Sequence, residues 1–304
     1  MTTIEIRGLT KRYGPDIVVD DVSFTVEPGQ VTGFLGPNGA GKSTTMKMIV
    51  GLAAPTRGSV TIGGRHYRDL PVPLTTVGAL LDAGAVHGGR TARDHLLALA
   101  VSNGLPRRRV DEVLARTGLD SVAGKRAGGF SLGMRQRLGI AATLLGDPQA
   151  LIFDEPVNGL DPEGIRWIRD LMRTLAREGR SVLVSSHLMS EMAQSADHLV
   201  VIGRGRLIAD TGMSEFLRAN GEGTVLVRTR EPGAFALRLT AAGATVREGL
   251  ESSLVVSGMS SDDIGALAAF HGVALSELTP QRASLEDAFM ELTRDSIQYQ
   301  GAAA

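Results

Sequence analysis

One stretch of the chain has residue types and a spacing that suit the binding of a polyphosphate. Residues 36–44 read Gly-Pro-Asn-Gly-Ala-Gly-Lys-Ser-Thr, which matches the pattern G-x-x-x-x-G-K-[ST]. Glycines allow the backbone to curl so that successive N–H groups point at an anion. Lys42 adds a positive charge for the outer phosphates, and the hydroxyl of Ser43 suits a Mg²⁺ ion. The stretch therefore predicts a loop that binds a polyphosphate together with Mg²⁺.

The residues around this stretch place it between a strand and a helix. The apolar run Val31–Leu35 predicts a buried strand and residues 43–52 predict a helix, so the glycines lie at a strand-to-helix turn. The N-terminus of such a helix adds about half a positive charge toward a bound anion. The alternative is a glycine-rich turn that matches by chance, and the flanking elements weigh against it. The residues expected to contact the phosphates are Gly36, Asn38, Gly39, Ala40, Gly41, Lys42, Ser43 and Thr44.

A second apolar strand ends in two carboxylates that suit the same chemistry. Residues 151–153 are apolar and are followed by Asp154 and Glu155. Residues at the carboxyl end of a parallel strand emerge at the edge of the sheet where ligands bind. We expect Asp154 to hold Mg²⁺, directly or through water, and Glu155 to accept a proton from the attacking water. The alternative is an ordinary acidic turn, which is less favoured downstream of a phosphate loop.

The composition describes a globular chain with no bias toward a polyanionic partner. The chain has 304 residues, 43% of them hydrophobic, a formal net charge of −1 and no cysteine. This neutral total gives no field that attracts nucleic acid, so we interpret the run Arg107–Arg109 as a solvated helix start. No apolar run approaches the length of about 18 residues that a membrane span requires. We therefore expect a cytosolic protein without disulfides, thiolate metal sites or a nucleic-acid partner.

The order of the predicted elements indicates two domains. Up to about residue 215, buried apolar runs alternate with helical patterns, which predicts an α/β domain whose sheet has a parallel core. From residue 224 the order becomes β-α-β-β-α-β, with a final helix over residues 284–292, which is a ferredoxin-like α+β plan. We expect one domain over residues 1–215, a linker that contains residues 220–223, and a second domain over residues 224–296.

A short segment between the phosphate loop and the two carboxylates completes a family pattern. Phe130–Met134 reads Phe-Ser-Leu-Gly-Met at a loop-to-helix junction, where the ATP-binding subunits of ABC transporters have the signature LSGGQ. With this segment, residues 1–215 carry the motifs of that family in order, and the chain resembles an ABC transporter ATP-binding subunit. The resemblance implies a P-loop NTPase fold with an antiparallel β subdomain and a helical subdomain. It also implies ATP and Mg²⁺ as cofactors and ATP hydrolysis as the activity.

The resemblance assigns further residues to the nucleotide. Ser131 and Gly133 match the signature residues that grip the ATP held by a second subunit, and Asp161 matches the loop that crosses the dimer interface. His187 matches the switch histidine at the γ-phosphate, and Tyr13 matches the aromatic residue that stacks on adenine. Without the resemblance, Ser131 and Asp161 would be ordinary helix caps and His187 a structural histidine. The catalytic set that follows is Lys42, Glu155 and His187.

Three positions depart from the family pattern. The family has a Gln after the strand near residues 77–81, which binds Mg²⁺ and senses the permease, and Asp82 occupies that place here. Leu132 and Met134 replace the Gly and Gln of the signature. A carboxylate can still reach Mg²⁺, and because Glu155 is present we expect an active ATPase. The expected Mg²⁺ ligands are Ser43, Asp154 and Asp82.

The resemblance also implies partners. The signature residues lie about a helix away from the phosphate loop, so a second subunit must be placed head-to-tail, and we expect a homodimer. A separate transmembrane permease would hold the chain at the inner face of the membrane. Residues 284–289 resemble the ending of drug- and antibiotic-export ATPases that partner an ABC-2-type permease. Export of a drug, antibiotic or lipid-like substrate is therefore favoured over import. The alternative for this segment is an amphipathic packing helix.

Two other classes of function stay open. The first is a soluble ATPase of the superfamily that acts on DNA or ribosomes, although the chain has neither a long coiled-coil insertion nor a second cassette. The other is a module in which the C-terminal part senses a ligand, although residues 216–304 contain no recognisable ligand motif.

Overall fold

The structure, a computed structural model, describes residues 2–82, 84–219, 224–249 and 253–281. The described residues divide into two units, one up to Met213 and the other beginning at Ser214, and each is described by itself. The linker expected at residues 220–223 and the final helix expected at residues 284–292 lie outside the described residues.

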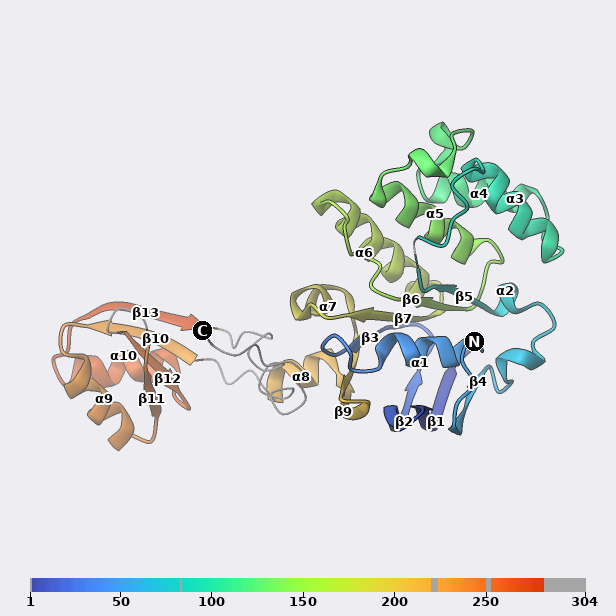
Figure 1. The fold of residues 1–304 in the computed structure, drawn as a ribbon. Helices are drawn as coiled ribbons and strands as arrows, with labels where there is room; N and C mark the ends of the chain where they lie inside the picture. Colours follow the sequence, from blue (N-terminus) through green and yellow to red (C-terminus); the bar gives the residue numbers. More distant parts are fainter. Residues whose placement is uncertain (1, 83, 220–223, 250–252, 282–304) are drawn as a thin grey trace. The chain divides into compact units, whose positions relative to one another are not determined.

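A six-stranded sheet with the order β5-β6-β7-β3-β8-β9 forms the centre of the first unit (Figure 1). Neighbouring strands are parallel except for β8 and β9, which pair antiparallel. Since parallel strands end at the same edge of a sheet, the residues that follow β3, β6 and β7 are brought together there. The strands are β3 (Val31–Leu35), β5 (Val77–Leu80), β6 (Ala150–Phe153), β7 (Ser181–Ser186), β8 (His198–Gly203) and β9 (Arg206–Gly212).

Both faces of this sheet are covered, so every residue of its central strands β3, β6 and β7 is buried. One face packs against α1 (Lys42–Ile49) and an antiparallel sheet in the order β2-β1-β4, with Met46 of α1 and Phe34 of β3 in one core. The other face carries α6 (Pro162–Arg177) and α7 (Met189–Ser195), as Figure 1 shows. The strands of the antiparallel sheet are β1 (Ile4–Tyr13), β2 (Asp16–Val26) and β4 (Arg57–Ile62).

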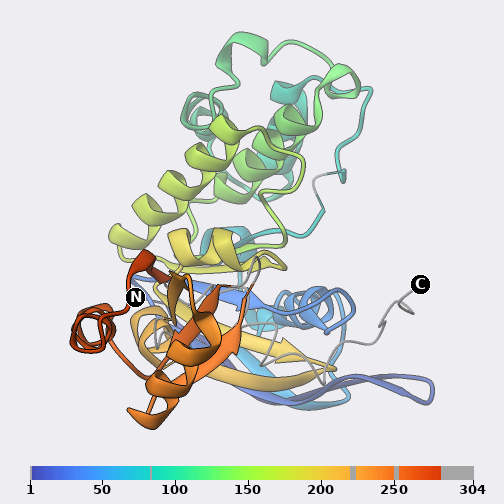
Figure 2. The same cartoon turned by 90° about the vertical axis from the view of Figure 1, so that its left-hand side faces the viewer.

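A helical region is inserted between β5 and β6 and lies beyond the sheet (Figures 1 and 2). Its first helix begins after Thr91, whose hydroxyl accepts a hydrogen bond from the backbone N–H of Asp94, as the capping pattern predicts. The helices of this region are α3 (Ala92–Ser102), α4 (Arg108–Arg116) and α5 (Leu132–Leu144). The short helices of the first unit are η1 (Tyr67–Asp69), α2 (Pro73–Thr76), η2 (Asp120–Val122) and η3 (Ala127–Gly129).

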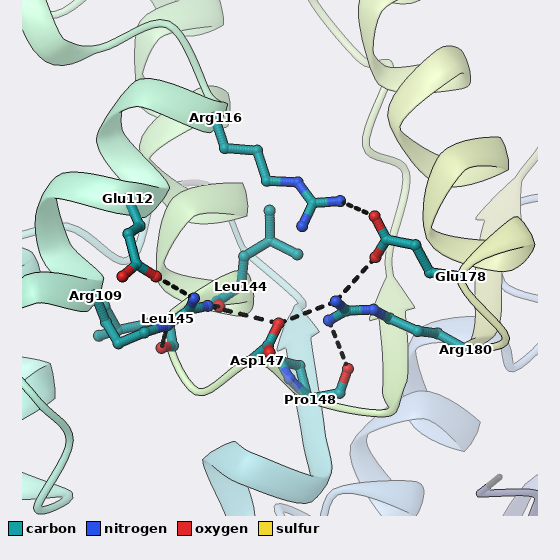
Figure 3. A network of polar contacts seen from close by, with 9 residues as sticks. All are labelled: Arg109, Glu112, Arg116, Leu144, Leu145, Asp147, Pro148, Glu178 and Arg180. Carbon is teal, nitrogen blue, oxygen red and sulfur yellow. Dashed lines mark hydrogen bonds and ion pairs between the residues drawn. The ribbon is translucent and has the colours of Figure 1, made fainter.

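A network of charged side chains ties the helical region to the sheet (Figure 3). Arg180, at the entry to β7, binds Asp147 and Glu178 at 2.9 Å each and donates to the carbonyl of Pro148 at 3.0 Å. From α4, Arg116 reaches Glu178 at 2.8 Å. Arg109 of α4 binds Glu112 and Asp147 and donates to the carbonyls of Leu144 and Leu145. The network therefore spans α4, the end of α5 and the turn between α6 and β7.

The second unit contains the β-α-β-β-α-β order expected from the sequence. Its antiparallel sheet has the order β11-β12-β10-β13, the ferredoxin-like arrangement. One face packs on both helices through a core that includes Val227, Phe235 and Ile264. The elements are α8 (Met213–Ala219), β10 (Thr224–Thr229), α9 (Pro232–Ala241), β11 (Thr245–Glu248), β12 (Leu254–Ser257), α10 (Ser261–Phe270) and β13 (Leu275–Gln281). Across the described residues of the whole chain, no helix is long and apolar enough to cross a bilayer.

Candidate active site

The phosphate loop lies between β3 and α1, the strand and helix that the sequence predicts. A side chain at Gly36 would place its Cβ 2.3 Å from the backbone oxygen of Ile202, so this close passage by β8 admits only glycine. The loop surrounds a cavity of about 220 Å³. The residues that line it are Val18, Asn38, Gly39, Ala40, Gly41, Lys42, Ser43, Thr44 and Glu155. The structure thus brings most of the predicted phosphate contacts around one hollow and adds Glu155 to them.

Lys42 is held inside this loop by its own backbone. The ammonium donates to the carbonyl of Gly36 at 2.5 Å and to that of Pro37 at 3.2 Å. Burial lowers the pKa of Lys42 below its ordinary value, and the negative charges of Glu155 and Asp154 oppose that shift. The ammonium lies 3.8 Å from the nearer carboxylate oxygen of Glu155. A positive charge of this kind is available to a phosphate that enters the cavity.

The two carboxylates at the end of β6 have different partners. An oxygen of Asp154 accepts a hydrogen bond of 2.5 Å from the hydroxyl of Ser185, which also accepts one of 2.9 Å from the backbone N–H of Glu155. The carboxylate of Glu155 lies between Lys42 and His187, with His187 Nδ1 2.9 Å from its second oxygen. The strand ends therefore bring Glu155, His187 and Lys42, the predicted catalytic set, into one cluster.

A second, larger cavity of about 690 Å³ adjoins the carboxylates. Its lining includes Asp82, Asp154 and Glu155, so Asp82 does face the same space as the other two carboxylates. One oxygen of Asp82 accepts a hydrogen bond of 2.7 Å from the backbone N–H of Gly84, two residues ahead. The oxygen donors that the sequence selected for Mg²⁺, a hydroxyl from Ser43 and carboxylates from Asp154 and Asp82, are of the type that this ion prefers. The donor chemistry therefore fits Mg²⁺.

The signature segment caps a helix and contacts the loop after Glu155. The hydroxyl of Ser131 accepts from the backbone N–H of Met134 at 3.2 Å, at the first turn of α5. One turn later, the buried amide of Gln136 donates to the carbonyl of Pro156 at 2.8 Å. Leu132 packs closely on Gly159. A Cβ added at Gly159 would lie 2.0 Å from the Cδ2 atom of Leu132. Ser131 and Gly133 are not among the residues that line the phosphate-loop cavity.

The predicted site residues that line neither of these two cavities are Tyr13, Gly36, Ser131, Gly133, Asp161 and His187. Tyr13, at the end of β1, is 51% exposed, and the ammonium of Lys11 lies 4.8 Å from the centre of its ring. Asp161 caps α6 by accepting from the backbone N–H of Gly164 at 2.8 Å. Neither residue lines the described cavity walls, so their contacts to a nucleotide stay predictions.

Comparison with known proteins supplies the family. The family model described as "ABC transporter" matches residues 19–158, and a "Domain of unknown function" matches residues 223–286. "Bacitracin transport ATP-binding protein BcrA" of Bacillus licheniformis is 40% identical over 222 residues, which cover 72% of each chain. The protein of the same name from Enterococcus faecalis is 33% identical, over 95% of this chain and 96% of its own length. This chain belongs to the ABC transporter ATP-binding proteins. A solved structure described as "Structure of ATP binding subunit of ABC transporter" agrees, with a TM-score of 0.65 at 30% identity over 71% of this chain and 92% of that one.

Membership in this family confirms the α/β P-loop fold and the activity predicted from the sequence. The chain is an ATP-binding subunit whose hydrolysis of ATP is coupled to transport. ATP-binding subunits of this family dimerise and act with separate transmembrane permeases. The names of the relatives favour transport over the alternative of an ATPase that acts on DNA or ribosomes.

Ser185 is a residue of this site that the sequence did not reveal. It was visible only as part of an apolar strand followed by a histidine. Its contacts arise because β6 and β7 are adjacent and parallel, with Phe153 opposite Val184. The following residues, Asp154 and Ser185, therefore lie side by side at the ends of the two strands.

Proposed function

We propose that this chain powers the export of an antibiotic-like, drug-like or lipid-like compound through a separate permease of the ABC-2 type. Relatives named for bacitracin transport support the class of compound. The resemblance of residues 284–289 to the ending of export ATPases supports the direction. In this arrangement the chain lies at the inner face of the membrane through its permease.

The observation that carries the hydrolytic part of the proposal is the position of Glu155. Its carboxylate lies on the wall of the phosphate-loop cavity, 3.8 Å from Lys42 and 2.9 Å from His187. A base for water must lie within hydrogen-bond reach of a water that faces the γ-phosphate. In the proposed reaction Glu155 takes a proton from that water, and the water oxygen attacks the γ-phosphorus. The bond between this phosphorus and the bridging oxygen breaks, and ADP and phosphate leave.

Other residues bind and orient the nucleotide in this proposal. Lys42 and the backbone N–H groups of the loop neutralise the phosphates, and Tyr13 stacks on adenine. Mg²⁺, when bound, would be held by Ser43 and Asp154 with Asp82 nearby, and it offsets charge on the phosphate oxygens. His187 keeps the carboxylate of Glu155 oriented toward the cavity.

The site is completed by a second copy of the chain placed head-to-tail. Ser131 lies at the N-terminus of α5, where the helix dipole and a hydroxyl favour an anion. Ser131 and Gly133 do not line the phosphate-loop cavity of their own chain, which supports the proposal that they contact the γ-phosphate bound by the partner copy. Asp161 lies in the loop that would cross between the copies. ATP then bridges two subunits, and its hydrolysis removes the bridge and resets the permease.

The test exchanges one oxygen for nitrogen at the proposed base. Glu155→Gln keeps the size of the side chain but removes the proton acceptor, so turnover is expected to fall by about 10² or more. ATP binding and the ATP-dependent dimer should persist. The matched control is Glu163→Gln, the same change at an exposed residue in the first turn of α6. The chain is purified with its permease, and phosphate release, nucleotide binding and dimer mass are measured. Unchanged turnover in Glu155→Gln would refute the assignment.

A further inference from the structure

Ser185 is the residue that links the two carboxylates at the end of β6. Its side chain is fully buried next to the end of β7. Its hydroxyl donates to Asp154 at 2.5 Å and at the same time accepts from the backbone N–H of Glu155 at 2.9 Å. The hydroxyl oxygen of Ser185 is thus hydrogen-bonded to the side chain of Asp154 and to the main chain of Glu155. The first is the proposed Mg²⁺ ligand, and the second is the proposed base.

The backbone of Glu155 explains why such a contact is needed. Glu155 has φ = 48°, in the left-handed region that costs free energy for a residue with a side chain. The strand ladder ends just before it, because the backbone N–H of Asp154 is the last to bond to β5, at the carbonyl of Leu80. The N–H of Glu155 instead points to the neighbouring strand, and the Ser185 hydroxyl is its acceptor. The hydroxyl therefore stabilises the unusual turn that directs the carboxylate of Glu155 into the cavity.

The end of β7 holds Glu155 at two places. Ser185 fixes its main chain at 2.9 Å, and His187, two residues further on, contacts its carboxylate at 2.9 Å. The carboxylate is also 3.8 Å from Lys42. A displacement of the main chain at Glu155 would change both side-chain contacts together. Placement of a reacting group matters steeply, since a misplacement of about 1 Å can reduce a rate by about 10².

A hydroxyl fills this role with a single atom. The site requires a donor toward a carboxylate and an acceptor for an N–H on the same short side chain. Serine and threonine supply both on one oxygen, whereas alanine and valine supply neither.

From this geometry we propose that Ser185 is a positioning residue for ATP hydrolysis, which acts through Asp154 and Glu155 without contacting the nucleotide. The inference rests on the roles proposed above for those two residues. Loss of the hydroxyl is expected to slow the chemical step and to leave the binding of ATP almost unchanged. A residue that served only to fill the core would affect stability and leave turnover per folded molecule unaltered.

The test compares three substitutions in the full chain purified with its permease. Ser185→Ala removes the hydroxyl, Ser185→Thr retains it, and Ser181→Ala is the matched control. Ser181 is a fully buried serine at the far end of the same strand, and its hydroxyl donates to the carbonyl of Thr2 at 2.5 Å. For each variant, kcat and KM for Mg²⁺-ATP are measured. Urea unfolding of each variant chain without the permease, followed by the fluorescence of Trp167, gives its stability.

We expect Ser185→Ala to lower kcat about tenfold or more, with KM changed less than about twofold. Ser185→Thr should retain kcat within about threefold of the original chain, and Ser181→Ala should retain all of it. The proposal is overturned if Ser185→Ala keeps its kcat, if Ser185→Thr fails to restore turnover, or if Ser181→Ala loses as much. Glu155→Gln is measured in the same assay. Full turnover in Glu155→Gln would refute the role of the base and the proposal for Ser185 with it, whereas loss of turnover in Glu155→Gln with unchanged kcat in Ser185→Ala would refute the proposal for Ser185 alone.

Discussion

Arg180 offers a sharp test of how the helical region is joined to the sheet. Its side chain is 10% exposed and makes three polar contacts, at 2.9 Å to Asp147, 2.9 Å to Glu178 and 3.0 Å to the carbonyl of Pro148 (Figure 3). Replacement by methionine keeps an apolar stem of similar length and removes all three contacts.

The expected loss follows from the burial of each partner. Removing one member of a fully buried charge pair costs about 3–5 kcal/mol, because the other charge stays uncompensated. Here the side chains of Asp147 and Glu178 are 55% and 36% exposed, so water can hydrate both after the change. The bond to Pro148 is a hydrogen bond from a charged donor, worth about 1.5–3 kcal/mol. We therefore expect Arg180→Met to lower the free energy of unfolding by about 2 kcal/mol.

The control is an ion pair of similar geometry on the surface. Arg7 lies 2.6 Å from Glu5, but its side chain is 77% exposed, so Arg7→Met is expected to cost no more than about 0.5 kcal/mol. The single tryptophan of the chain, Trp167, lies in α6 of the first unit. Urea titrations followed by its fluorescence therefore report the unfolding of that unit without interference from the second. Equal losses for the two variants would refute the argument from burial.

Two further predictions concern charges in the first unit. Lys42→Ala should weaken ATP binding by about tenfold or more, since the cavity loses its full positive charge. Lys47→Ala, at an exposed position on the same helix, should leave ATP binding unchanged. Titration with a fluorescent ATP analogue measures both affinities, and equal values would contradict the role of Lys42. Burial lowers the pKa of His95, and the nearby Arg90 and His87 lower it further. Because the folded chain takes up this proton only at a lower pH than the unfolded chain does, stability should fall as the pH drops from about 7 to about 5. His95→Gln should reduce that fall in urea titrations at the two pH values, and an identical pH dependence in both chains would count against it.

The phosphate loop and the main strands were predictable because their signals are local. The strand Val31–Leu35 has the bounds expected from its apolar run, and the glycines and Lys42 follow it directly. Two strands that pair as neighbours, β8 and β9, were not predicted, and neither was the short helix α7 before them. β9 has no buried residue among its seven, so its sequence lacks the apolar signal of a core strand. β9 is instead held in the sheet by its backbone pairing with β8, which its own sequence does not predict.

The start of α6 carries a local signal in its capping aspartate. Asp161, which taken alone was expected to cap a helix, does cap α6, and the helix begins at Pro162. A capping aspartate followed by proline is a typical helix start. The apolar periodicity, by contrast, becomes clear only one turn later.

The cluster at the site could be predicted only in part. The sequence selected Glu155 and His187 separately, but their contact of 2.9 Å depends on the adjacency of β6 and β7. Strand order is a property of the whole sheet, so neither segment alone predicts it. The same holds for Ser185, whose position beside Asp154 follows from the parallel register of the two strands.

The hydrogen bond between Gln136 and Pro156 bears on communication between the two nucleotide sites of the proposed dimer. The amide belongs to the helix that begins at Ser131, and the carbonyl belongs to the residue directly after Glu155. In the proposed head-to-tail pair, that helix end would contact the ATP of the opposite site, whereas Glu155 would act on the ATP bound by its own subunit. A single buried hydrogen bond of 2.8 Å would therefore connect the helix that contacts the opposite ATP to the residue next to Glu155. Communication between the two nucleotide sites would then not have to pass through the permease.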